Sequence, residues 1–145
     1  MLYDKLIFPK RTLTVILLSM LSMGFLSVTA ARKKPVQKIK VACIGNSITY
    51  GTGIQDREHF SYPVQLQKML GDKYLVGNFG KPGATLLNHG HRPYMQQEEY
   101  RQAMAFKGDI AVIHLGINDT DPRNWPNYRD EFVQHYLSLI DSLRS

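Results

Sequence analysis

Three short apolar runs, each followed by small polar residues, divide the chain and alternate with stretches of helical spacing. The runs cover residues 39–44, 74–79 and 110–115, and the third is almost wholly apolar. A short run of this kind, bounded by Gly or polar residues, is typical of a parallel strand that is covered on both faces. The alternation of strands and helices predicts an α/β fold in three layers, with a parallel sheet between helices.

Helical spacing separates the three runs. Ser61 and Pro63 mark the start of a first helix, which Gly71 closes. A second helical stretch of about ten residues extends from Tyr94 toward Phe106. A third covers 128–143 and carries one apolar stripe, made of Phe132, Tyr136, Leu139, Ile140 and Leu143.

The charge is concentrated at the N-terminal end. The chain has 18 Lys and Arg against 12 Asp and Glu, for a formal net charge of +6. Residues 41–145 hold 10 basic and 11 acidic residues, so the part predicted to fold is nearly neutral. A nucleic-acid surface needs clustered positive charge, and we therefore exclude nucleic acid as a partner.

Residues 1–31 have the pattern of a secretory signal peptide. Lys5, Lys10 and Arg11 form a basic segment, residues 13–28 are mostly apolar, and small residues follow at 29–31. Such an apolar stretch is short against the roughly 20 residues that span a bilayer, which disfavours a permanent membrane anchor. We expect membrane contact only during export, a secreted or periplasmic location, and a basic joint over 32–38.

Cysteine and histidine give little support for a metal centre. Cys43 is the one cysteine, so neither an internal disulfide nor a cysteine-based zinc finger is available. His89 and His91 form a His-Gly-His sequence that invites a metal pair. No carboxylate or third ligand can be identified beside them, and a loop that lines the substrate cleft is the preferred interpretation.

Small polar clusters follow all three predicted strands, as Gly45-Asn46-Ser47, Asn78-Phe79-Gly80 and Gly116-Ile117-Asn118-Asp119. In parallel sheets the carboxyl ends of the strands lie at one edge, where ligands bind. Ser47 there offers a nucleophile, and the N–H groups of Ser47 and Gly80 with the Asn118 amide offer donors for a tetrahedral oxyanion. The alternatives are a serine that caps the next helix and ordinary turn residues at the other positions.

These three clusters resemble the first three motif blocks of the SGNH (GDSL-type) hydrolase family. The resemblance implies a flavodoxin-like three-layer fold, Ser47 as nucleophile, and Gly80 and Asn118 in the oxyanion hole. Asn46 stands where the family signature has Asp, at a position outside the catalytic triad. We further assign Asn46, Asp119 and His89 to substrate binding.

The fourth block of the family, an Asp-x-x-His that supplies the catalytic base, does not follow Asn118 in this sequence. The segment Asp56-Arg57-Glu58-His59 has the matching residue types, but it precedes the second strand, whereas the family block follows the other three. We expect residues 39–145 to form an incomplete SGNH domain without its C-terminal strands. Such a chain leaves its third strand as an open edge and is expected to have little activity alone.

Further stretches, among them the loop over 118–126, resemble secreted bacterial carbohydrate esterases of the sialate O-acetylesterase type. This resemblance implies a carboxylic ester hydrolase that removes O-acyl groups, chiefly O-acetyl, from carbohydrates such as sialic acid, with no cofactor. The alternative is a non-catalytic carbohydrate-binding module with Trp125, Tyr128, Tyr94 and Tyr100 as stacking platforms. A nucleotide-phosphate site is excluded, because Gly45 and Gly51 are not followed by Lys-Ser/Thr.

Overall fold

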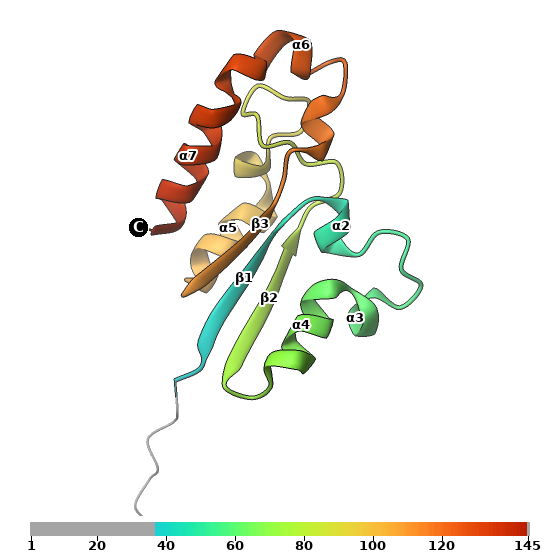
Figure 1. Cartoon of the computed structure of the whole chain (residues 1–145), viewed down its shortest axis with the longest axis vertical. Coiled ribbons are helices and arrows are strands. Elements are labelled where there is room, and N and C mark those ends of the chain that lie inside the picture. The colour runs from blue at the N-terminus through green and yellow to red at the C-terminus, as the bar shows by residue number, and fades with distance from the viewer. Residues whose placement is uncertain (1–36, 145) are drawn as a thin grey trace, which may run out of the picture. The chain divides into compact units, whose positions relative to one another are not determined.

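The computed structural model describes residues 37–144, and the predicted signal peptide lies outside them. Strands β1 (Ile39–Gly45), β2 (Tyr74–Gly80) and β3 (Ile110–His114) form one parallel sheet in the order β2-β1-β3 (Figure 1). All three predicted strands are confirmed, with ends that differ by one residue. The α/β class is confirmed as well.

Helices cover both faces of this sheet (Figure 1). On one face, Tyr62 at the start of α4 (Tyr62–Leu70) lies beside Cys43 of β1. On the other face, Ala42 and Ile44 pack with residues of α5 (Glu98–Phe106) and α7 (Phe132–Arg144). The β1 side chains thus alternate between two helical layers, and the three-layer arrangement is confirmed.

Short helical turns complete the described part of the chain. They are α2 (Ser47–Tyr50), α3 (Arg57–Phe60), α6 (Trp125–Tyr128) and the 3-10 turns η1 (Tyr94–Gln96), η2 (Ile117–Thr120) and η3 (Arg129–Glu131). Among residues 37–144, no helix has the length and the hydropathy to cross a membrane.

Two of the predicted helices start later than their spacing indicated. Gln97 is extended, with φ −87° and ψ 160°, so the stretch from Tyr94 to Phe106 is broken into η1 and α5. The last helix begins at Phe132, after η3, in place of residue 128. Its predicted apolar stripe is confirmed, because Leu139 is fully buried and Phe132 and Tyr136 pack against the core.

Strand β3 is an edge of the sheet in the described residues. Its apolar side chains are exposed in part, with Ile110 at 47% and Val112 at 36%. A hollow of about 430 Å³ lies beside it, between β3, α5 and α7. The apolar pattern of β3 predicted a central strand covered on both faces. In the order β2-β1-β3 it is an edge strand instead, as expected for a domain without its C-terminal strands. An uncovered apolar edge of this kind favours self-association.

The strand register brings the three polar clusters together. In the parallel ladders Gly45 lies opposite Gly80 on one side and opposite His114 on the other. The three strands therefore end at the same edge of the sheet, side by side. This alignment positions the candidate site.

Gly80 allows β2 to end directly against α2. A Cβ atom on Gly80 would lie 2.6 Å from the Tyr50 Cα and 2.7 Å from the Thr49 carbonyl carbon, both of which are backbone atoms. Backbone cannot move aside as the end of a long side chain can. Any larger residue at position 80 must therefore push α2 away from the sheet.

We predict that Gly80→Ala destabilises the fold by roughly 2–4 kcal/mol through this overpacking. Urea denaturation followed by circular dichroism measures the change. Gly53→Ala is the control: Gly53 has φ +83° but no neighbour within 4 Å of a Cβ. It is expected to cost about 1 kcal/mol, from backbone strain alone. Equal losses in the two variants would contradict the close approach of α2.

Candidate active site

Ser47 is the first residue of α2 and follows directly on β1. The residue before it, Asn46, caps this helix, because its Oδ1 accepts a hydrogen bond of 3.0 Å from the Ile48 N–H. The alternative in which Ser47 itself is the cap is therefore wrong. Ser47 is half-buried, and its hydroxyl has no hydrogen-bond partner within residues 37–144.

Asn46 is fully buried under this turn. Its Oδ1 holds the helix cap, and its Nδ2 has no partner among the described residues. A side chain without exposed surface is poorly placed to meet a substrate. Its position favours a role in orienting Ser47 over the predicted role in substrate binding.

Gly80 lies at the end of β2, against the backbone of α2, and so close to the turn that carries Ser47. The next residue, Lys81, donates its N–H to the Gly45 carbonyl at 2.8 Å, which ties the start of the following loop to β1. The Gly80 N–H itself donates to Asn78 Oδ1 at 3.0 Å. This predicted oxyanion donor thus already has a partner, with which an oxyanion must compete.

Asn118 lies in η2, which follows β3. Gly116, with φ +114°, turns the chain into η2 in the left-handed region that favours glycine. The Asn118 Nδ2 donates to the Ala84 carbonyl at 2.8 Å, in the loop after β2. A primary amide carries two N–H groups, so this bond leaves one of them as a donor for substrate.

Asp119 has a structural place in the same turn. Its side chain is fully buried, and its two oxygens accept the Leu86 N–H at 2.9 Å and the Leu87 N–H at 2.7 Å. Each carboxylate oxygen thus has a backbone N–H partner in the loop after β2. The structure therefore favours a positioning role for Asp119 over the predicted contact with substrate.

Asn124 is a functional-site residue that the sequence reasoning missed. It is 1% exposed, and its amide nitrogen contacts the Asn118 carbonyl and His91 Nδ1, each at 2.9 Å. Its amide oxygen accepts the His91 N–H at 2.9 Å. Asn124 thereby joins the loop after β2 to the loop after β3. No local pattern marks such a residue, since His91 is 33 positions away.

None of the five histidines is hydrogen-bonded to Ser47 in the described residues. His59 pairs with Asp56 at 2.9 Å in an exposed turn, and His114 is exposed on the edge strand. Neither these nor the other histidines form a hydrogen bond with Ser47 in the described part of the chain. The described residues therefore place the predicted nucleophile and donors at one edge, without a base hydrogen-bonded to Ser47.

His89 and His135 meet at the carboxylate of Glu131. His89 does not pair with His91: its Nδ1 lies 2.7 Å from Glu131 Oε2. The His135 side chain is only 13% exposed, and its Nδ1 accepts the Asn88 N–H at 3.2 Å. No pattern in the sequence indicated that the side chains of Glu131 and His135 lie beside His89.

Buried hydroxyl and thiol groups lie beneath the site on the α4 face. Burial raises the pKa of Tyr62 to about 12, and burial also raises the pKa of the Cys43 thiol. The Tyr62 hydroxyl contacts the Thr49 hydroxyl at 3.2 Å. Both Cys43 and Tyr62 therefore stay neutral near pH 7, and Cys43 is a small buried group.

The sequence matches a known protein family. The family model described as "GDSL-like Lipase/Acylhydrolase family" matches residues 43–145. The chain belongs to this family. It is 52% identical over 106 residues to an acetylxylan esterase of Xylanibacter ruminicola, a match that covers 73% of this chain and 22% of that protein.

A solved structure supports the fold. The chain resembles AlinE4, an SGNH-hydrolase family esterase, with a TM-score of 0.52 and 22% sequence identity, over 74% of this chain and 54% of AlinE4. The predicted SGNH fold is confirmed. The chain thus spans about a fifth of the acetylxylan esterase and about half of AlinE4.

We predict that Asp119→Ala destabilises the loop after β2, because it leaves the buried N–H groups of Leu86 and Leu87 without acceptors, at a cost of about 2–4 kcal/mol. Hydrogen exchange of these two amides measures the effect. Asp130→Ala is the control, since the Asp130 side chain is 98% exposed. Unchanged protection of both amides in Asp119→Ala would contradict the positioning role.

Proposed function

We propose that this chain carries the nucleophile and the oxyanion donors of a serine carboxylic ester hydrolase that removes acetyl groups from carbohydrates. The observation that carries the proposal is the alignment of Gly45, Gly80 and His114 at one level of the sheet. It places Ser47, Gly80 and Asn118 on neighbouring segments. Membership in the GDSL-like family supports the same reaction.

In the proposed reaction, the Ser47 hydroxyl oxygen attacks the ester carbonyl and forms a tetrahedral intermediate. The Ser47 N–H and the free N–H of the Asn118 amide bind its oxyanion, and the Gly80 N–H joins them when Asn78 releases it. The intermediate collapses to an acyl-serine, and the proton taken from Ser47 passes through the base to the leaving oxygen, which gives the free sugar hydroxyl. Water then attacks the acyl-serine, which yields acetate and restores the Ser47 hydroxyl.

This reaction needs a base for the Ser47 proton. In the SGNH resemblance an Asp-x-x-His block provides it, and this chain has none after Asn118. The His59–Asp56 pair has the matching residue types, but it is exposed and forms no hydrogen bond with Ser47. We therefore propose that residues 37–144 alone hydrolyse esters only weakly, since a serine without a base is a poor nucleophile.

The substrate class follows from two resemblances. The loop over 118–126 is similar to sialate O-acetylesterases, whereas the relative with 52% identity is named an acetylxylan esterase. Both names describe O-acetyl groups on a sugar hydroxyl. We propose a carbohydrate acetyl ester as substrate, xylan before sialic acid, in a protein exported through residues 1–31.

The burial of Tyr94 removes one stacking platform from the alternative, a non-catalytic sugar-binding module. Tyr94 is fully buried, donates its hydroxyl to the Phe79 carbonyl and packs edge-on against Tyr100. Trp125 also packs edge-on against Phe132, but it is 40% exposed. Labelling at Ser47 therefore distinguishes the enzyme from the binding module.

Labelling with a fluorescent fluorophosphonate tests the nucleophile. The full chain is treated with and without added imidazole, which replaces the absent base. We expect labelling at Ser47, enhanced by imidazole, and its loss in Ser47→Ala. Ser138→Ala, on the exposed face of α7, is the matched control. A chain that binds acetylated sugar without labelling at Ser47 is a binding module.

We predict that Asn118→Ala slows the acylation of Ser47 by about 10²–10³-fold, because it removes one oxyanion donor. The rate is measured with the same probe, and the melting temperature is recorded because Asn118 also binds Ala84. Asn127→Ala is the control, because the Asn127 amide also donates to a backbone carbonyl, that of Arg123, but at an exposed position. A folded Asn118→Ala protein that reacts within about threefold of the parent contradicts this role.

We also predict a substrate order. Acetate release, measured with an acetate-specific coupled assay, is expected to be faster from acetylated xylo-oligosaccharides than from O-acetylated sialic acid. The comparison uses the imidazole-supplemented chain, and Ser47→Ala sets the background. The reverse order would assign the site to sialic acid esters.

A further inference from the structure

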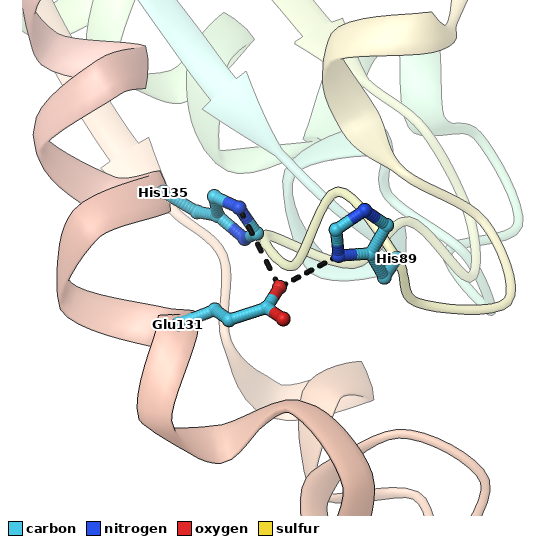
Figure 2. A group of neighbouring side chains, drawn as sticks. All are labelled: His89, Glu131 and His135. Atoms are coloured by element: carbon cyan, nitrogen blue, oxygen red, sulfur yellow. Dashed lines mark hydrogen bonds and ion pairs between the residues drawn. The ribbon is translucent and has the colours of Figure 1, made fainter.

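We propose that His89, Glu131 and His135 form a binding site for one divalent transition-metal ion of the zinc type. Figure 2 shows the three side chains turned toward one another, His89 from the loop after β2, Glu131 from η3 and His135 from α7. One ligand atom of each residue lies within 4.8 Å of the other two. The argument for this site does not depend on the proposed ester chemistry.

The distances suit a small ion after slight movement. Glu131 Oε2 lies 2.7 Å from His89 Nδ1 and 3.7 Å from His135 Nε2. Zinc bonds of about 2.0–2.2 Å in a tetrahedron separate neighbouring ligand atoms by about 3.4 Å. The two observed spacings lie on either side of this value. Two imidazoles and one carboxylate are also a ligand set that zinc uses, with water in the fourth position.

The exposure of the three groups allows an ion to enter. The side chains of His89 and Glu131 are 62% and 37% exposed, whereas that of His135 is 13% exposed. Glu131 ends η3 and His135 lies in the first turn of α7, four residues later, with helical backbone at Phe132 between them. Two ligands are thus held by adjoining helical segments, and the third lies on the loop after β2.

Asn88 determines which nitrogen of His135 is available. The Asn88 N–H donates to Nδ1, which leaves the ring proton on Nε2, facing Glu131. A metal at Nε2 requires this proton to move to Nδ1, and the Asn88 N–H must then release Nδ1. Asn88 also has a buried side-chain oxygen without a partner in the described residues. We assign it as the acceptor of the Nδ1 proton once the metal is bound, a common arrangement behind metal-binding histidines.

The ion would strengthen the connection between the loop after β2 and the last helix. Glu131 is 42 positions from His89 in the sequence, and the loop already meets α7 through the Asn88–His135 hydrogen bond and the β3 side through Asp119 and Asn124. An ion that binds only the folded state stabilises it by RT ln(1 + [L]/Kd), so the stabilisation grows as the free ion concentration exceeds the dissociation constant. Its expected effect is therefore on stability.

Titration of the tag-free full chain with Zn²⁺ tests the proposal by calorimetry and by thermal unfolding. We expect one equivalent to bind and the melting temperature to rise by about 5 °C or more at saturation. Mg²⁺ is expected to have no effect, because imidazole is a poor ligand for it. Absence of saturable one-to-one Zn²⁺ binding overturns the proposal.

Variants distinguish this site from other histidines. His89→Ala and Glu131→Gln, both at exposed side chains, are each expected to weaken Zn²⁺ binding by roughly tenfold or more. His59→Ala is the matched control, because His59 also pairs with a carboxylate at 2.9 Å but lies outside the three-residue cluster. If His59→Ala weakens binding and His89→Ala does not, the proposed site is wrong.

The tautomer of the His135 ring tests whether its Nε2 binds the metal. His135→Ala also removes the acceptor of the Asn88 N–H, so circular dichroism first establishes that it folds. Nitrogen chemical shifts of the His135 ring then report the tautomer in the unsubstituted chain. We expect the proton to move from Nε2 to Nδ1 on addition of Zn²⁺. A ring whose tautomer stays unchanged while Zn²⁺ binds excludes Nε2 of His135 as a ligand.

Discussion

The parallel pairing that aligns Gly45 with Gly80 and with His114 decides where every candidate residue lies. A parallel ladder brings strands to a common edge, whatever the length of the segments between them. Here the alignment is reinforced by Gly80, which lets α2 approach β2 closely, and by the Lys81 N–H, which binds the Gly45 carbonyl. Without this register Ser47 and the two proposed donor residues would lie on unrelated loops.

Buried polar side chains then organise the loops above that edge. Asp119 binds two backbone N–H groups of the loop after β2, and Asn124 binds the same loop through His91. Asn46 holds the turn before Ser47. Polar groups in a protein interior must be paired, so a carboxylate or amide that finds several partners there restricts the loops that supply them. These residues position the proposed catalytic groups from beneath.

Much of the architecture was predictable, because apolar runs and helical stripes are local patterns. The strands, the three layers and the stripe of α7 were all anticipated. The break at Gln97 was not, since an extended residue between two helical turns leaves no mark in the spacing of apolar residues. The roles of Asp119 and Asn124 were also missed. Their partners lie about 33 positions away, and single residue types at such separations carry no signal.

The amino-acid sequence by itself determined the order of strands and helices, the family blocks around Ser47, Gly80 and Asn118, and the near neutrality of the folded part. These properties follow from short-range patterns and from residue types. Only the tertiary structure decided that Asn46 and Asp119 are buried, that the Gly80 N–H is already bonded, and that His89 meets Glu131 and His135. Such contacts depend on where two distant loops meet in space, and only the packed helices and the strand register determine that.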